Sequence, residues 1–353
     1  MDETATKPEV SIKPEVSIKE VARVAGVSIA TVSRCLNDPE SVREPTRDKV
    51  TKAIVETGYS PNVLAQSFRR GKTNVIMVVL PSVGDPFFTD VLKGIRTVAR
   101  ANGYAIMINE TQFNTLAADE IGAMMVSRWA DGMVLLASLS PYGTEVLSAR
   151  SHRAIPIVVG CETISPELAR FPSVHIDNAA AAREATDYLI SMGHKRVGFV
   201  SGEATSLLTL DRERGYRAAM KAAKLGIESG WVVQGNMNIP GAIKATRSLV
   251  NHKRRPTAIF CANDEMAMGA YHETKSAGLK IPEDISVVGF DDTRYAEVMD
   301  PPLTTICQPA EEIGERTLYR LCKAIEGKGE LGDTPEIVPH QLIVRRSVAK
   351  PRR

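Results

Sequence analysis

The hydrophobic positions of this 353-residue chain follow two different patterns, one before and one after about residue 74. After that point, short and nearly continuous apolar runs alternate with helical segments, from VIMVVL at 75–80 to ISVVGF at 285–290. Such strands are typical of parallel sheets with helices on both faces. About 280 residues of this pattern suit two lobes better than one sheet. We predict two doubly wound α/β lobes with a ligand site between them, beyond the carboxyl ends of the strands.

Before residue 60 the apolar positions are few and have helical spacing. Ser17 followed by Glu20 predicts a capping box that opens a helix at 18–24, and a turn follows at Gly26. A second short helix precedes a third, which begins after Pro45 and ends at Gly58. Their apolar side chains can form one small core: Val21, Ala22, Val32, Leu36, Val50, Ala53 and Ile54. Helix, glycine turn and short helix form the helix-turn-helix arrangement of DNA-binding proteins.

The stretch AGVSIATVSRCLND, at 25–38, has a polar face that suits DNA. This face carries hydroxyl, guanidinium and amide groups, on Ser28, Thr31, Ser33, Arg34 and Asn37. Hydroxyls and amides bind phosphates, and arginine can pair bidentately with guanine. An ordinary helical hairpin with a solvated face is the alternative that these residues alone leave open.

Charge supports a DNA-binding head weakly. The whole chain has a formal net charge of only +2, whereas residues 17–72 carry ten Lys and Arg against six Asp and Glu, a balance of +4. The five cysteines have no CxxC spacing, and no apolar run is long enough to span a membrane. We therefore expect a cytoplasmic protein with no membrane segment.

The motifs of common enzymes are absent. RRGKT at 69–73 lacks the first glycine of a phosphate-binding loop, because Gln66 stands in its place. There is no GxGxxG, GxSxG or HExxH motif, and His175 and His194 are better explained as structural residues. The pairs Asn263-Asp264 and Asp291-Asp292 end apolar runs, with no nucleophile or metal partner in view. We predict no enzyme activity, no cofactor and no metal.

Motifs along most of the chain resemble the LacI/GalR family of repressors. The segment from SIKEVARVAGVSIATVSRCLND to SPNVLAQSF is similar to the headpiece of that family, nearly position for position. In the core, DPFFTDVLKGI, GHKRVGFVSG, CANDEMAMGA and LKIPEDISVVGFDDT extend the resemblance to about residue 346. DPFF, PSVHIDN and DPPLTTICQP are most similar to the branch of cytidine repressors.

The resemblance implies a division of the chain. We expect a disordered tail at 1–16, the helix-turn-helix domain at 17–59, a hinge helix or linker at 60–73, a two-lobed core at 74–346 and a tail at 347–353. In the core we expect the first lobe to hold about 74–172 and 305–335, and the second about 173–304 and 336–346.

The resemblance also assigns DNA-binding residues. Ile29, Ala30 and Arg34 would read bases, with apolar contacts to thymine methyls from the first two. Ser28, Thr31, Ser33 and Asn37 would hold phosphates. In the hinge, Asn62, Ala65 and Gln66 match the family, but Phe68 stands where the family wedges a leucine into the minor groove. The alternatives are that Ile29 packs inward and that Phe68 packs against the core.

For the effector, Phe87 and Phe88 would stack on a ring, and Arg212 and Asp291 would anchor polar groups. Asn263 and Glu162 would lie nearby, while Leu208 replaces a small polar residue of several sugar-responsive members. The alternative for Asp291 is a simple cap at a strand end.

These observations predict a ligand-responsive, sequence-specific repressor of catabolic genes. It would bind a pseudo-palindromic operator as a homodimer, with a sugar or nucleoside effector in the cleft. The chain has no terminal leucine heptads that would predict a tetramer. The alternatives are a periplasmic-type solute-binding protein and a repressor that responds to a purine or a protein partner.

Overall fold

The computed structural model describes residues 16–59, 72–111, 120–124, 127–137, 155–161, 171–204, 206–327 and 334–352. They belong to two compact units, Met1–Thr73 and Asn74–Arg353, each of which is described by itself. The expected tail up to residue 15 and most of the expected hinge lie outside the described residues, as do four candidate site residues: Asn62, Ala65, Phe68 and Glu162.

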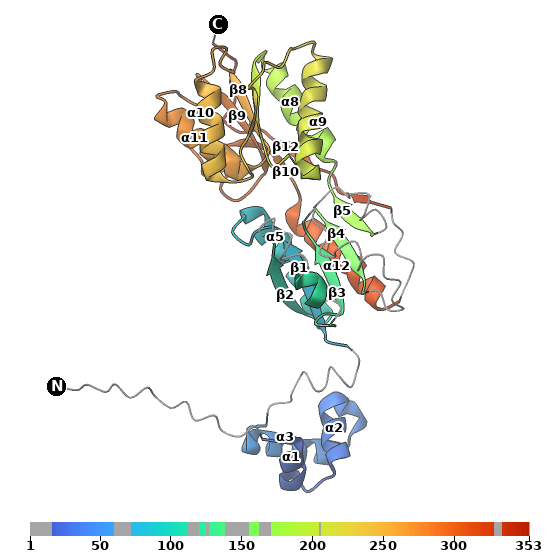
Figure 1. Ribbon diagram of the computed structural model, residues 1–353. Helices are drawn as coiled ribbons and strands as arrows, with labels where there is room; N and C mark the ends of the chain where they lie inside the picture. The colour runs from blue at the N-terminus through green and yellow to red at the C-terminus, as the bar shows by residue number, and fades with distance from the viewer. Residues whose placement is uncertain are drawn as a thin grey trace, which may run out of the picture. The chain divides into compact units, whose positions relative to one another are not determined.

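The first unit is a small three-helix domain (Figure 1). Its elements are α1 (Ile18–Ala25), α2 (Ile29–Asn37), the short 3-10 helix η1 (Pro39–Ser41) and α3 (Glu44–Thr57). Gly26 and Gly58 end α1 and α3 in the left-handed region, at φ 65° and 64°. The buried core holds five of the seven expected side chains and one that was not expected: Val21, Ala22, Val32, Val50, Ala53 and Cys35. Leu36 and Ile54 are partly buried against it.

The expected capping box does not form at α1. Ser17 is the N-cap residue, but its side chain accepts no hydrogen bond there. The Glu20 carboxylate instead accepts from the Arg23 guanidinium one turn later, at 3.0 Å from Nε, because a full opposite charge attracts it more strongly than a backbone amide.

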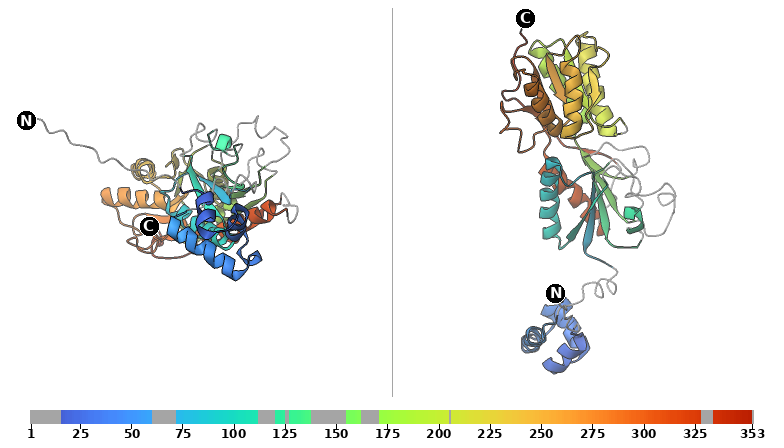
Figure 2. Two further views of the ribbon diagram at one scale, coloured as in Figure 1. Left: turned by 90° about the horizontal axis from the view of Figure 1, so that it is seen from below. Right: turned by 60° about the vertical axis from the view of Figure 1, so that its left-hand side comes forward.

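The second unit contains two six-stranded sheets in two lobes (Figures 1 and 2). The first sheet has the order β11-β5-β4-β3-β1-β2, and its strands are β1 (Val75–Leu80), β2 (Ala105–Glu110), β3 (Gly132–Leu135), β4 (Ile157–Gly160), β5 (Ser173–His175) and β11 (Glu336–Ile337). The second has the order β12-β10-β9-β8-β6-β7, and its strands are β6 (Val197–Ser201), β7 (Val232–Gln234), β8 (Ala258–Cys261), β9 (Ser286–Asp291), β10 (Thr304–Cys307) and β12 (Gln341–Ile343). All neighbouring strands pair in parallel except β10 and β12.

Helices cover these sheets in pairs (Figure 1). In the first lobe α5 (Pro86–Ala101) packs against α12 (Ala310–Ile325). In the second lobe α8 (Asn178–Ser191) and α9 (Leu207–Ala222) cover one face, and α10 (Ile239–Val250) and α11 (Asp264–Ser276) cover the other. The eight apolar runs of the sequence all form strands, which confirms the predicted doubly wound α/β class.

The expected lobe boundaries need correction at three short strands. Ser173–His175 and Glu336–Ile337 belong to the first sheet rather than the second lobe. Residues 305–307, expected in the first lobe, belong with Thr304 to strand β10 of the second sheet. The chain therefore passes between the lobes after β5, after β10 and after β11. Strands of two to four residues, rich in Ser, Thr, His and Glu, carry too weak an apolar signal to fix a boundary.

Two glycines let α5 and α12 cross closely. A Cβ on Gly94 would lie 2.0 Å from the carbonyl oxygen of Glu311, and one on Gly314 would lie 2.1 Å from that of Val91. We expect Gly94→Ala to lower the free energy of unfolding by roughly 1–3 kcal/mol, because the helices must separate. Thermal denaturation of Gly226→Ala is the control, since Gly226 has nothing within 4 Å of its Cβ position. Equal melting temperatures for the two variants would contradict the close crossing.

Candidate DNA-binding and effector sites

The second helix presents the expected reading face to solvent. Ile29 has 45% of its surface exposed, and Ala30 and Arg34 are exposed as well, so the alternative that Ile29 packs inward is wrong. The Ser28 hydroxyl caps α2 by accepting from the backbone N–H of Thr31 at 3.1 Å. It also lies 2.9 Å from the Thr31 hydroxyl. The hydroxyls of Ser28 and Thr31, which were expected to contact DNA phosphates, therefore also fix the N-terminus of α2.

Two further candidates on α2 are less informative. Ser33 is half-buried. Asn37 ends the helix, and its side chain lies outside the described residues.

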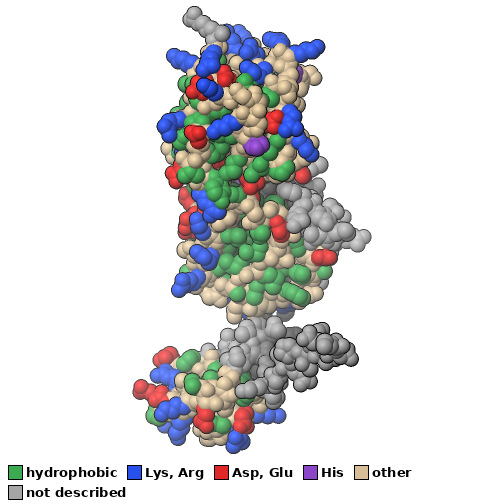
Figure 3. Space-filling model, turned by 90° about the vertical axis from the view of Figure 1, so that its left-hand side faces the viewer, with side chains coloured by type: hydrophobic (Ala, Val, Ile, Leu, Met, Phe, Trp, Pro, Cys, Tyr) green, Lys and Arg blue, Asp and Glu red, His purple; other side chains and the backbone are tan. Residues whose placement is uncertain are grey.

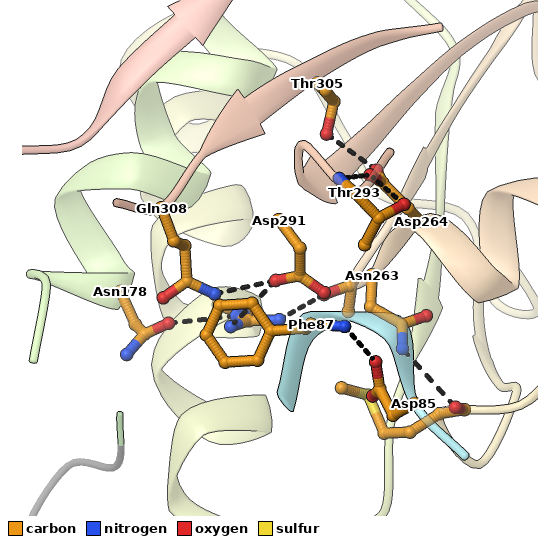
Figure 4. A network of polar contacts seen from close by, with 12 residues as sticks. Asp85, Phe87, Asn178, Asn263, Asp264, Asp291, Thr293, Thr305 and Gln308 are labelled. Carbon is orange, nitrogen blue, oxygen red and sulfur yellow. Dashed lines mark hydrogen bonds and ion pairs between the residues drawn. The ribbon is translucent and has the colours of Figure 1, made fainter. Parts of the chain in front are cut away.

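In the second unit, the buried side chain of Arg212 is the centre of a polar network (Figure 4). It lies on α9, and its Nε–H donates to Oδ1 of Asn178 at 2.9 Å. A terminal N–H donates to the carbonyl oxygen of Ala262. The other terminal nitrogen lies 3.8 Å from Oδ1 of Asp291, and the guanidinium stacks 3.7 Å from the ring centre of Phe290. Three partners and one ring therefore fix its plane.

Asp291 ends β9, where its backbone adopts a φ of 111°. Its carboxylate accepts from Nε2 of Gln308 at 2.6 Å and faces Arg212, so its polar partners come from α9 and the end of β10 rather than from a local strand-end cap. Burial raises the pKa of Asp291 well above its ordinary value, although Arg212 acts in the opposite direction.

The predicted aromatic pair lies at the start of α5. The Asp85 carboxylate caps this helix by accepting from the N–H of Phe87 at 2.9 Å. The rings of Phe87 and Phe88 pack edge to face, with centres 5.3 Å apart. Phe87 lines the hollow described below, and Phe88 packs behind it in the hydrophobic core.

Asn263 has a structural role in this conformation. Its Oδ1 caps α11 by accepting from the N–H of Met266 at 2.8 Å, and its Nδ2 donates to the carbonyl oxygen of Met237 at 3.3 Å. The cap accounts for the Asn-Asp pair that the sequence places after an apolar run.

Three buried polar atoms near Arg212 were not expected as site atoms. Nδ2 of Asn178, Oε1 of Gln308 and Oγ1 of Thr209 have no hydrogen-bond partner among the described residues. Asn178 and Gln308 are fixed at their other ends by Arg212 and Asp291. Such groups are costly to bury unpaired, so they favour a ligand that offers both a donor and an acceptor.

Carboxylic acids line the hollow beside this network, and four of them pair with cations outside the lining. It has a volume of about 430 Å³ and is lined by Phe87, Asp90, Asp291, Asp292, Thr293, Gln308, Pro309, Ala310, Glu311 and Glu312. Five of these side chains are carboxylic acids, and none is Lys, Arg or His.

Two further acids close to the network carry less negative charge than ordinary carboxylates, because their pKa values are raised. Burial, together with the charge of Asp85, raises the pKa of Glu265 to about 7. Burial also raises the pKa of Asp264 to about 7, although this carboxylate accepts hydrogen bonds from Thr293 and Thr305.

A head with an exposed second helix and a two-lobed core with a polar cleft define a DNA-binding regulator with a ligand sensor. Residues 17–62 match the model "Bacterial regulatory proteins, lacI family". Residues 73–346 match "Periplasmic binding proteins and sugar binding domain of LacI family". The chain belongs to the LacI family of bacterial transcriptional regulators.

Curated relatives support this assignment. The chain is 35% identical over 328 residues to the HTH-type transcriptional repressor CytR of Escherichia coli (strain K12), covering 93% of this chain and 95% of the relative. It is 35% identical over 332 residues to the repressor PurR of Proteus mirabilis (strain HI4320), covering 94% and 96%. The similarity to CytR supports the cytidine repressor-like branch. These relatives are repressors, which confirms the prediction that the chain is a regulator rather than an enzyme.

Solved structures agree. The lac repressor dimer bound to operator and the anti-inducer ONPF has a TM-score of 0.82 at 25% identity, over 95% of this chain and 100% of that one. The complex of the transcriptional regulator CelR with cellobiose has a TM-score of 0.71 at 28% identity, over 94% and 100%. Within the described residues, no helix is long and apolar enough to cross a membrane.

Proposed function

We propose that this repressor is a cytoplasmic homodimer that binds a pseudo-palindromic operator and responds to a nucleoside or a sugar in the cleft between its lobes. The observation that carries the proposal is the pairing, in one chain, of an exposed reading helix with a cleft built around Arg212. The affinity of one small head for DNA is too low for operator binding, so two heads must act together.

In this proposal Ile29, Ala30 and Arg34 contact base edges. Phosphate contacts come from Ser28, Thr31, Ser33 and Asn37. The hinge contributes Asn62, Ala65 and the wedge residue Phe68 at the minor groove.

At the effector site, Phe87 stacks on the ring of the ligand with Phe88 behind it. Arg212 and Asp291 bind its hydroxyl groups, and Glu162 and Asn263 belong to the same site. Effector binding changes the relation of the two lobes and thereby the affinity for the operator, as a coupling free energy between two sites.

A nucleoside fits this cleft better than its phosphate ester. The similarity to CytR supports a nucleoside, and no Lys, Arg or His lines the hollow to bind a phosphate group, since the nearby Lys93, Arg316 and Arg345 already pair with its carboxylates. We expect a nucleoside to raise the melting temperature and its 5′-monophosphate to bind at least tenfold more weakly. At one hundred times the dissociation constant, a ligand stabilises the folded state by about 2.7 kcal/mol.

The measurement is a thermal-shift titration with nucleosides, their 5′-monophosphates, purine bases and common sugars. Stabilisation by a sugar alone would change the ligand class and leave the family assignment intact. Equal stabilisation by a nucleoside and its phosphate would show that the acidic lining does not select the ligand.

A further inference from the structure

A surface of positive charge lies at the amino ends of the strands in the second sheet (Figure 3, upper end). Three segments contribute to it, just before β6, just before β8 and at the chain's C-terminus. We call it the amino-edge surface, and its exposed cations are Lys195, Arg196, Lys253, Arg254, Arg255, Lys350 and Arg352.

Hydrogen bonds hold the first two segments together. The Nε–H of Arg196 donates to the carbonyl oxygen of Arg255 at 3.0 Å, and the N–H of Thr257 donates to that of Arg196 at 2.8 Å. The buried His194 ring lies 2.9 Å from the Thr257 hydroxyl.

The C-terminal segment is fixed to the same place. Nε2 of His194 lies 2.9 Å from the carbonyl oxygen of Ala349, whose N–H donates to the Ser286 hydroxyl at 3.1 Å. Burial lowers the pKa of His194, which keeps this ring neutral at physiological pH. Lys350 and Arg352 are thus presented by a fixed backbone.

Most of these cations are unpaired. Arg254 pairs with Glu228 and Arg352 with Asp284, whereas the other five have no carboxylate partner among the described residues. The C-termini of α8, α9, α10 and α11 also lie at this edge, because each of these helices leads into a strand of the sheet, and each helix end carries the equivalent of about half a negative charge. Four helix ends offset about two of the five cations, and the exposed Glu283 just before β9 offsets one more, so a surplus of positive charge remains.

The amino-edge surface is separate from the effector cleft. Ser286, which holds the C-terminal segment, begins β9, and Asp291 of the cleft ends the same strand. The two sites therefore lie at opposite ends of one sheet. A ligand at this surface would leave the cleft open.

We propose that the amino-edge surface binds the phosphate backbone of a second DNA duplex without regard to sequence. Duplex DNA suits this surface better than a protein partner because Trp231 and Val348 beneath it are buried, although Val344, just after β12, is exposed at the same edge. Stable protein interfaces need apolar anchors, whereas the DNA backbone needs only cations and hydrogen-bond donors. A repressor bound to its operator would thereby hold another segment of DNA.

The test uses full-length protein whose heads are saturated with unlabelled operator. A short labelled duplex of unrelated sequence is then titrated at several salt concentrations. With about five phosphate contacts, the slope of log K against log salt concentration should be about −4.5. The double variant Lys195→Gln with Arg255→Gln should reduce its magnitude by about 1.8 and leave operator affinity unchanged.

The matched control is Lys244→Gln with Arg183→Gln, an exposed lysine on α10 and an exposed arginine on α8 of the same lobe, both away from the C-terminal ends of their helices. It should bind the labelled duplex as the wild type does. Failure of the operator-saturated wild type to bind the labelled duplex would overturn the proposal. Equal salt slopes for the two double variants would also overturn it, even if Lys195→Gln with Arg255→Gln lowers the melting temperature. The cations would then only balance the charge of the helix ends.

Discussion

Replacing Arg34 by alanine is expected to abolish the preference of this repressor for its operator. The side chain is exposed on α2, so its removal leaves the core of the head intact. Loss of a bidentate contact to guanine costs about 1–3 kcal/mol per head, and a dimer loses it twice. We therefore expect operator affinity to fall by about two orders of magnitude or more, towards the affinity for unrelated DNA.

A competition assay between labelled operator and unrelated DNA measures this effect at a fixed salt concentration. Lys49→Ala is the control, since Lys49 is exposed on α3, outside the reading helix. Effector binding should be the same in both variants and the wild type. If Arg34→Ala retains its operator preference, α2 is not the helix that reads bases.

The fold of the head could be predicted because helix periodicity and turn residues agree there. The end of α1 was placed within one residue, and Gly58 ends α3 as expected. The predicted capping box does not form because Arg23 competes with the backbone N–H groups for the Glu20 carboxylate. The sequence motif alone does not show this competition. In the core, every long apolar run became a strand. β5, β10, β11 and β12 were missed because their two to four residues mix polar and apolar side chains, which leaves no apolar run or periodicity to detect.

The candidate effector site was only partly accessible from the sequence. Family resemblance selected Arg212 and Asp291, and the structure brings them together from α9 and the end of β9. Asn178 and Gln308 were missed because their importance comes from contacts across the fold. Asn178 reaches Arg212 from 34 positions away, and Gln308 reaches Asp291 from 17. No local motif marks an amide whose second group is buried without a partner.

Arg212→Lys is expected to uncouple the repressor from its effector while keeping the positive charge. A lysine ammonium cannot donate to Asn178, Ala262 and Asp291 in the fixed plane of a guanidinium. The effector then loses a hydrogen bond from a correctly oriented charged donor, which is worth about 1.5–3 kcal/mol. We expect effector affinity to fall by roughly 10- to 100-fold.

The control is Arg217→Lys, the same substitution on the same helix, where the side chain is half exposed and pairs with Glu213. A nucleoside that stabilises the wild type should stabilise this control equally and Arg212→Lys far less. In operator binding, Arg212→Lys should retain the affinity of the wild type but lose its response to the nucleoside. Equal responses of the two variants would mean that positive charge alone is needed at position 212. The hydrogen bonds from Arg212 to Asn178 and Ala262 would then stabilise the fold without contributing to ligand binding.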